Sequence, residues 1–139
     1  MKKHPALTEQ RLLAADPADY MNQAQLDFFR KRLLEMRAEL VVNATRTADE
    51  MKQMVVPSDP ADRATLEEEY ALELRTRERE LRLSVKIDAA LRRIEDGSYG
   101  YCEETGEPIG LPRLLARPTA TLSIEAQERR ERLQKSFAN

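Results

Sequence analysis

Apolar residues recur at steps of three and four along two long stretches of the chain. The first stretch begins at Asn22, and its seam positions are Leu26, Phe29, Leu33, Met36, Leu40, Ala44, Thr47, Met51 and Met54. This spacing places side chains on one face of a helix and is typical of a coiled-coil seam. Pro57 follows soon after, and a proline disfavours helical geometry at the residue before it. The pattern therefore predicts a long helix that ends near residue 54.

A second long helix is predicted from Ser58–Asp59–Pro60 to Asp96. Aspartate suits the N-cap, proline suits the first helical position, and Gly97 is a glycine stop. The apolar positions form two stripes, Leu66, Tyr70, Leu74 and Leu81, and then Leu83, Ile87, Leu91 and Ile94. The short connection makes the two helices antiparallel, and each extends on the order of 50 Å at about 1.5 Å per residue. Their seams can pair within one chain, so we expect a monomer; a dimeric bundle is the alternative that the pattern leaves open.

The remaining segments lack this long periodicity. Residues 1–21 predict a loose leader with one short helical turn between Leu7 and Ala15. Residues 98–122 mix apolar side chains with glycine and proline, which indicates a small turn-rich head. A closing helix is predicted from Ser123, its N-cap, to Phe137. The fold class is therefore mainly α, with a leader (1–21), a long antiparallel two-helix coiled coil (22–97) whose tip lies near 55–64, and a small globular head with a C-terminal helix (98–139).

Composition and charge favour a protein partner over nucleic acid or membrane. Of the 139 residues, 35% are charged and 41% hydrophobic, which is too polar for a thick core and too apolar for wholesale disorder. The 23 Lys and Arg against 25 Asp and Glu give no basic excess, so we expect no direct sequence-specific DNA binding. No apolar run approaches membrane-spanning length, and one cysteine cannot form an intrachain disulfide, which together predict a cytoplasmic protein.

The head carries the spacing of a zinc site but lacks three of its four cysteine ligands. The segment Cys102-Glu-Glu-Thr105 is followed, after seventeen residues, by Ser123-Ile-Glu-Ala126. Cysteine at all four marked positions would give two Cys-x2-Cys knuckles and a tetrahedral zinc site. Neutral hydroxyls are poor zinc ligands and alanine has no donor, so we expect no metal. Cys102 itself is interpreted as a small, partly buried relic residue, with a redox-sensing thiol as the alternative.

Three stretches, in order and at matching separations, resemble the DksA/TraR family of bacterial transcription factors. They are YMNQAQL at 20–26, then DPADRA at 59–64 with EEE at 67–69 and LELR at 72–75, and finally YGYCE at 99–103 with IG at 109–110 and ARPTA at 116–120. The resemblance implies a zinc-finger-like head and a coiled coil that enters the secondary channel of RNA polymerase, core or holoenzyme. The family's Asp-x-x-Asp-x-Ala tip falls on Asp59, Asp62 and Ala64.

The resemblance also implies a function. Members of the family are not enzymes; they destabilise open promoter complexes and potentiate the alarmone ppGpp in the stringent response. Basic positions that match Arg79 and Lys86 contact polymerase or the alarmone phosphates. The missing cysteines resemble those of zinc-independent paralogues, which are thought to replace the zinc form when the metal is scarce. One departure is Gln127, which stands where zinc-containing relatives commonly carry a lysine, although Arg129 is close in sequence.

Two other functions remain open from the residues alone. Acidic tip residues could hold magnesium and water for transcript cleavage, as in Gre-type factors, or the coiled coil could be a purely structural adaptor. Asp59 and Asp62 also fit the N-cap and N3 positions of a helix, where acids are stabilising without any further function. An experiment on the tip therefore has to distinguish a role of these acids in activity from their role in capping the helix.

Overall fold

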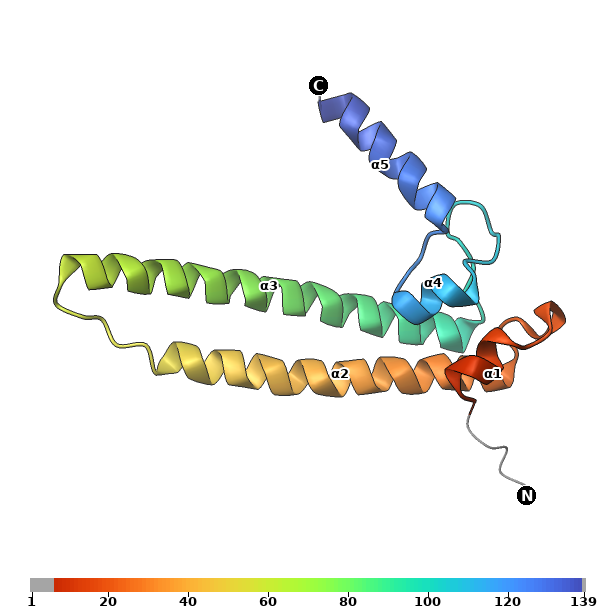
Figure 1. The fold of residues 1–139 in the computed structure, drawn as a ribbon, viewed down its shortest axis with the longest axis horizontal. Helices are drawn as coiled ribbons and strands as arrows, with labels where there is room; N and C mark the ends of the chain where they lie inside the picture. Colours follow the sequence, from red (N-terminus) through yellow and green to blue (C-terminus); the bar gives the residue numbers. More distant parts are fainter. Residues whose placement is uncertain (1–6, 139) are drawn as a thin grey trace, which may run out of the picture. The chain divides into compact units, whose positions relative to one another are not determined.

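The computed structural model describes residues 7–138 and consists of helices joined by loops (Figure 1). Along the chain these are α1 (Glu9–Leu13), the 3-10 helix η1 (Pro17–Asp19), α2 (Gln23–Lys52), α3 (Pro60–Asp96), α4 (Leu111–Ala116) and α5 (Ile124–Ala138). The only strand-like pairing among the described residues is an isolated bridge between Tyr101 and Pro108. The predicted mainly α class is therefore confirmed. No helix in this part of the chain has the length and apolarity needed to cross a membrane.

The described residues divide into two compact units. One holds the chain up to Leu33 together with everything from Ala89 onward, and the other is Leu34–Asp88. The division differs from the predicted one, because the first part of α2 and the last part of α3 belong with the head. The second unit is a helical hairpin made of the remainder of both helices and the loop that joins them.

Local capping fixes where α2 begins. The Asn22 side chain accepts a hydrogen bond from the Gln25 N–H (2.9 Å), and the Gln25 side chain accepts one from the Met21 N–H (2.9 Å). These bonds satisfy amides that a helix start leaves without backbone partners. The predicted start at Asn22 is confirmed as a cap, and α2 ends at Lys52, two residues before the predicted end.

Both predicted ends of α3 are also confirmed. The Asp59 carboxylate accepts a hydrogen bond from the Ala61 N–H (3.0 Å), and Pro60 is the first helical residue. At the other end Gly97 has φ of +85°, a left-handed conformation that favours glycine. This turn directs the N–H groups of Ser98 and Tyr99 back to the Arg93 carbonyl at 3.0 and 3.1 Å.

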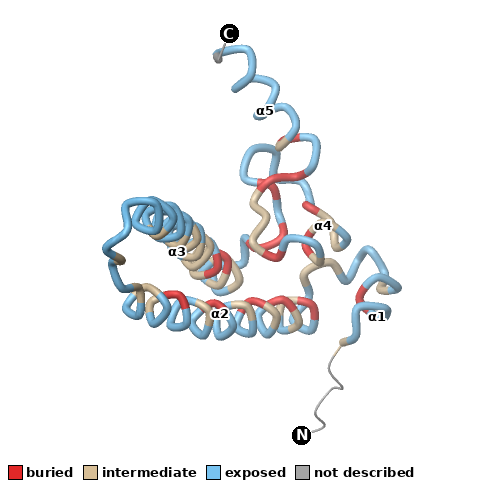
Figure 2. The backbone as a smooth tube through the Cα atoms, turned by 60° about the vertical axis from the view of Figure 1, so that its left-hand side comes forward, coloured by how far each residue is buried: buried red, intermediate tan, exposed pale blue. Residues whose placement is uncertain are grey.

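The seam of the hairpin follows α2 as predicted, with one exception. Figure 2 shows the buried positions along one side of α2; in the hairpin these include Leu40 and Thr47. Ala44 is exposed, so its predicted place in the seam is wrong. The half-buried Asn43 lies one residue earlier and keeps the heptad step from Leu40 to Thr47.

The predicted seam of α3 is wrong over its middle turns. Leu74 and Leu81 are 40% and 61% exposed. Half-buried positions occur instead at Glu73, Thr76 and Glu80, which lead at steps of three and four to Leu83 and Ile87. A shift of one residue rotates a side chain by about 100° around the helix, so the register set by Ile87 turns the two leucines outward.

The core of the first unit is built around aromatic residues. Phe29 and Tyr99 are fully buried, and their ring centroids are 5.6 Å apart. The Tyr99 hydroxyl donates to the Pro118 carbonyl (2.7 Å). The Tyr20 hydroxyl donates to the Gly100 carbonyl (2.6 Å) and accepts from the Gly110 N–H (3.0 Å). These hydrogen bonds connect the loops at residues 99–100, 110 and 118 to one another, with Tyr20 as the link between Gly100 and Gly110.

The leader is more ordered than its sequence pattern predicts. The expected helical turn is α1, which is capped by Thr8 and packs on α4 with Leu12 fully buried. Glu9 pairs with Arg32 of α2 at 2.7 Å. Only the part of the leader before Leu7 lies outside the described residues.

Candidate functional sites

The predicted acidic tip lies in the loop and first turns of α3. Asp59 is the N-cap, and its carbonyl also accepts from the Arg63 N–H (2.9 Å). Asp62 stands in the first helical turn, and both Asp62 and Ala64 have exposed side chains. Both residues lie at the positive end of the α3 dipole, where acidic side chains are stabilising. Capping therefore accounts for Asp59, whereas the Asp62 carboxylate points to solvent, where a partner can reach it.

A basic groove runs along α3 in the hairpin unit. It has a volume of about 520 Å³, and its lining residues are Thr76, Arg79, Glu80, Arg82, Leu83 and Lys86. The structure brings the two predicted residues Arg79 and Lys86 together, two turns apart on one side of the helix. Guanidinium and ammonium groups in such an arrangement suit phosphate oxygens.

Sequence reasoning did not single out Arg82, which lines the same groove between Arg79 and Lys86. The signal that would have found it is the spacing of 79, 82 and 86, because residues three and four apart are neighbours on a helix. Glu80 contributes the groove's one acid, and its Oε2 atom is buried without a hydrogen-bond partner among the described residues.

The degenerate metal positions come together in the head around Cys102, which is only 3% exposed. Burial raises the pKa of the Cys102 thiol, but hydrogen bonds from the Thr105 side chain and from the backbone N–H groups of Ser123, Thr105 and Glu104 outweigh it. Together they lower the pKa from the ordinary 9.0 to about 6.

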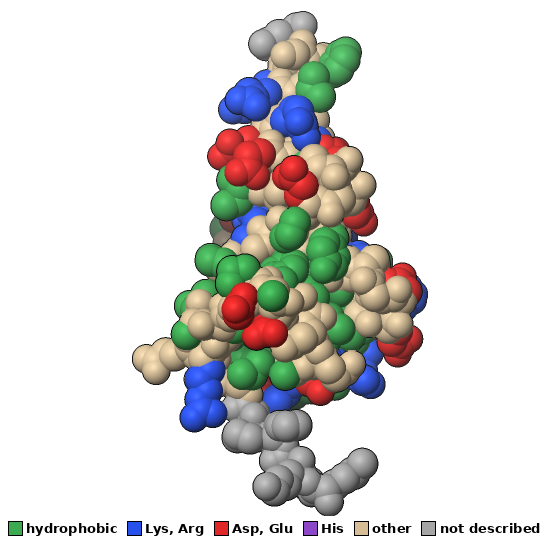
Figure 3. All heavy atoms as spheres, turned by 90° about the vertical axis from the view of Figure 1, so that its right-hand side faces the viewer, with side chains coloured by type: hydrophobic (Ala, Val, Ile, Leu, Met, Phe, Trp, Pro, Cys, Tyr) green, Lys and Arg blue, Asp and Glu red, His purple; other side chains and the backbone are tan. Residues whose placement is uncertain are grey.

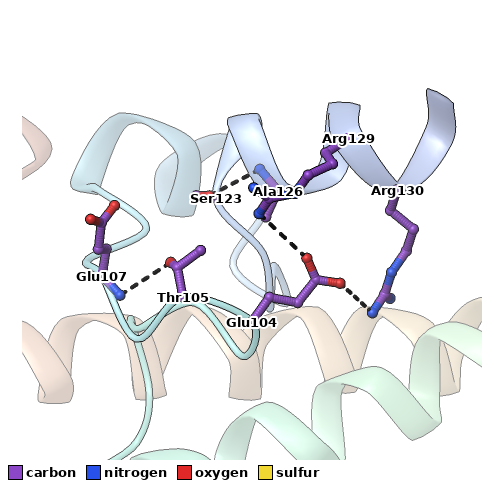
Figure 4. A network of polar contacts seen from close by, with 7 residues as sticks. All are labelled: Glu104, Thr105, Glu107, Ser123, Ala126, Arg129 and Arg130. Carbon is purple, nitrogen blue, oxygen red and sulfur yellow. Dashed lines mark hydrogen bonds and ion pairs between the residues drawn. The ribbon is translucent and has the colours of Figure 1, made fainter. Parts of the chain in front are cut away.

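The four side chains do not fit a zinc ion. The Thr105 hydroxyl accepts from the Glu107 N–H (3.3 Å), and the Ser123 hydroxyl accepts from the Ala126 N–H (3.2 Å), so both serve turns and caps (Figure 4). Ala126 is fully buried and offers no donor. Within residues 7–138 no group of three or more His, Cys, Asp and Glu side chains is placed to hold a metal. One thiolate with two hydroxyls and a methyl group is a poor tetrahedral ligand set.

Ion pairs link the first knuckle, residues 102–105, to α5. Glu104 pairs with Arg130 at 2.8 Å and with Arg129 at 3.8 Å (Figure 4). Arg129 is therefore in an ion pair with Glu104, and the Gln127 side chain donates a hydrogen bond to Glu131 (2.9 Å). Figure 3 shows Lys and Arg side chains near the C-terminal end of the head and Asp and Glu side chains beside them. Such half-exposed pairs contribute less than about 1 kcal/mol each, so burial around Tyr99 contributes most to holding the head.

The Cys102 thiol is expected to titrate with a midpoint near pH 6, which its thiolate ultraviolet absorbance would record in the folded protein. Because the folded pKa lies below the unfolded value, deprotonation stabilises the fold. This contribution is fully present above about pH 9 and is lost as the pH falls through 6. The free energy of unfolding should therefore rise between pH 6 and 9, and Cys102→Ser should flatten that rise. A midpoint near 9 in the folded protein would contradict the prediction.

The fold and these sites define a class of protein. It combines a helical hairpin, whose second helix has an acidic N-terminal turn, with a zinc-finger-like head that lacks three of the four cysteine ligands. Residues 25–94 match the family model described as "DnaK suppressor protein DksA, N-terminal domain". Residues 97–132 match "Prokaryotic dksA/traR C4-type zinc finger". The chain belongs to the DksA/TraR family.

Similar proteins agree with this assignment. The "RNA polymerase-binding transcription factor DksA" of Caulobacter vibrioides is 57% identical over 114 residues, which cover 81% of this chain and 80% of that protein. The protein of the same name from Escherichia coli (strain K12) is 45% identical over 121 residues, or 86% and 80% of the two chains. Among solved structures, "transcription factor DksA2 from Pseudomonas aeruginosa" matches with a TM-score of 0.82 and 52% identity, covering 92% of this chain and 99% of that one.

Proposed function

We propose that this protein is a transcription regulator that binds RNA polymerase through its secondary channel and shortens the lifetime of open promoter complexes. The relatives named above are RNA polymerase-binding transcription factors, and they match this chain over four fifths of its length. The observation that carries the proposal is the Asp59–Asp62–Ala64 turn, in which only Asp59 is used by the helix start. The protein would act in the cytoplasm, where its partner works.

The proposed mechanism is a population shift rather than catalysis. An exposed carboxylate can accept hydrogen bonds from one arrangement of the polymerase channel and repel another. If the protein binds one polymerase state better, it moves the equilibrium toward that state by its difference in affinity. Asp62 would thereby disfavour the open promoter complex without taking part in a chemical step.

The basic groove is proposed as this protein's share of a ppGpp site formed with polymerase. Arg79, Arg82 and Lys86 present three cations within two helical turns, which suits the adjacent phosphates of the alarmone. The Gln127 position lies outside this groove, so its departure from the family's lysine leaves the three cations in place. The expected readout is a stronger effect of the protein when ppGpp is present.

The direct test is the lifetime of open complexes at a ribosomal promoter, measured with competitor DNA at saturating protein. We expect a shorter lifetime with the protein, and a further decrease with ppGpp. Arrested elongation complexes treated with the same protein should show no transcript cleavage. An unchanged lifetime at saturation would disprove the proposed function.

Activity is also expected to survive removal of metal ions. Because the head's donor set does not fit zinc, dialysis against a strong chelator should leave the protein's melting temperature unchanged, and the open-complex effect should persist after the chelator is removed and magnesium restored. A four-cysteine relative treated in parallel is the control and should lose structure, since structural zinc contributes folding free energy. Loss of helical circular dichroism from this protein after chelation would contradict the donor-set argument.

A further inference from the structure

A second groove lies near the acidic tip, and we name it the tip groove. Its volume is about 330 Å³, and its lining residues are Met51, Met54, Val56, Leu66, Glu67, Tyr70, Ala71 and Leu74. Met51 belongs to α2, Met54 and Val56 belong to the connecting loop, and the others belong to α3. Seven of these eight residues are apolar, so the groove offers an apolar surface with one acid at its side.

The tip groove exists because the two arms of the hairpin do not fill the space between them. The α2 seam changes from leucine to Thr47 and methionines toward its end, and α2 stops at Lys52. Tyr70 and Leu74 remain 45% and 40% exposed, and Val56 is 72% exposed. A groove with apolar walls is suited to an apolar side chain of a partner, and methionine side chains adapt to irregular partners.

The charge around the tip groove selects the kind of occupant. Between residues 59 and 73 six carboxylates stand against the single Arg63, and Glu67 lines the groove itself. Such a field repels the phosphates of DNA, RNA and free nucleotides. It attracts a group that carries positive charge beside an apolar side chain. Protein segments with an aliphatic or aromatic residue next to Lys or Arg have this chemistry.

We propose that the tip groove receives an apolar side chain of RNA polymerase, from a segment of the channel that also presents a basic residue to the tip carboxylates. This inference rests on the proposed function, because it assigns a second contact to the same end of the hairpin. The apolar contact would supply affinity and hold the α3 N-terminus in place. The Asp62 carboxylate lies about one helical turn from Leu66 and just over two turns from Tyr70, and it would then act at a fixed position.

The test is a matched pair of substitutions on neighbouring exposed residues of α3. Ala71→Leu adds three carbon atoms into the tip groove, whereas Leu72→Phe adds three carbon atoms at a 57% exposed position outside it. A second pair in the loop is Val56→Gln, which makes one wall polar, and Val55→Gln, whose 81% exposed side chain does not line the groove. All four positions are exposed, so folding should be unaffected.

The measurement is the dissociation constant of fluorescently labelled full-length protein from the cognate RNA polymerase. We expect Ala71→Leu and Val56→Gln to weaken binding roughly 10- to 100-fold, because apolar pockets discriminate by about that factor. The two control variants should bind like the wild type. Wild-type affinity for Ala71→Leu and Val56→Gln would overturn the tip groove assignment while leaving the proposed function intact.

Other results separate the inference from the proposed function and from other occupants. If the wild-type protein itself fails to bind polymerase, the proposed function fails and the inference falls with it. If sedimentation shows a dimer of the free protein that Ala71→Leu dissociates, the occupant is a second copy of this chain and our assignment is wrong. Photocrosslinking from position 70 to nucleic acid instead of a polymerase subunit would equally overturn it.

Discussion

Asp62→Asn is expected to remove most of the protein's effect on open promoter complexes while leaving the fold intact. Asparagine keeps the size and the hydrogen-bonding oxygen of the side chain but not its charge. Hydrogen bonds to charged groups are worth about 1.5–3 kcal/mol, which corresponds to roughly a 10- to 100-fold loss in the effect at equal occupancy. The measurement is the decay of open complexes at a ribosomal promoter with saturating variant protein.

The Asp62 experiment needs a control that separates the site from overall acidity. Glu68→Gln removes one exposed carboxylate from the same helix six residues further on, and it should retain nearly full activity. Asp59→Asn tests the cap, because asparagine is as good an N-cap as aspartate. The free energy of unfolding should change by no more than about 0.5 kcal/mol in all three variants. If Asp62→Asn and Glu68→Gln lower activity equally, the tip acts through net charge and not through a specific carboxylate.

Phe29→Ala is expected to cost about 3–5 kcal/mol of stability, the largest structural effect that we predict. Phe29 is fully buried and its ring lies against Tyr99, which is itself 1% exposed. Truncation removes apolar burial and leaves a cavity between α2 and the head. For a chain of this size the melting temperature should fall by about 10 °C or more. Thermal unfolding followed by circular dichroism provides the measurement.

Phe28→Ala is the matched control for this substitution. Phe28 is the same residue type at the next position, but it is only half-buried and lies beneath the Arg32 guanidinium at 5.2 Å from the ring centroid. Its truncation should therefore cost less than half as much. Equal costs at the two positions would mean that the core is not centred on the Phe29–Tyr99 contact.

Helix boundaries were largely predictable because their causes are local. Asn22, Asp59, Gly97 and Ser123 act on amides or carbonyls within five residues, so the sequence alone contains both partners of each interaction. Arg79 and Lys86 were named from the family resemblance, and their spacing of seven residues explains why they share one side of α3. The tip residues followed from family resemblance, and their role remains a prediction.

Which side of a helix is buried was less predictable from the sequence. Leu74 and Leu81 have the right period for a seam, yet they are exposed, while Glu73, Thr76 and Glu80 are half-buried. Over these turns the sequence favours the leucine stripe, and only the packing of Leu83 and Ile87 against the partner helix selects the polar stripe one residue away. The helical turn of α1 was predicted, but its packing was not, because Leu12 is buried by α4, which lies about a hundred residues later in the chain.

The sequence by itself determined the mainly α class, the hairpin, the helix ends, the family and the loss of the zinc ligands. Only the tertiary structure decided the register of α3, the two grooves, the burial of Leu12 and the lowered pKa of Cys102. The physical reason is the range of the interactions. Caps, turns and periodicity act within a few residues, whereas burial, cavities and the solvation of a thiol depend on side chains that only folding brings together.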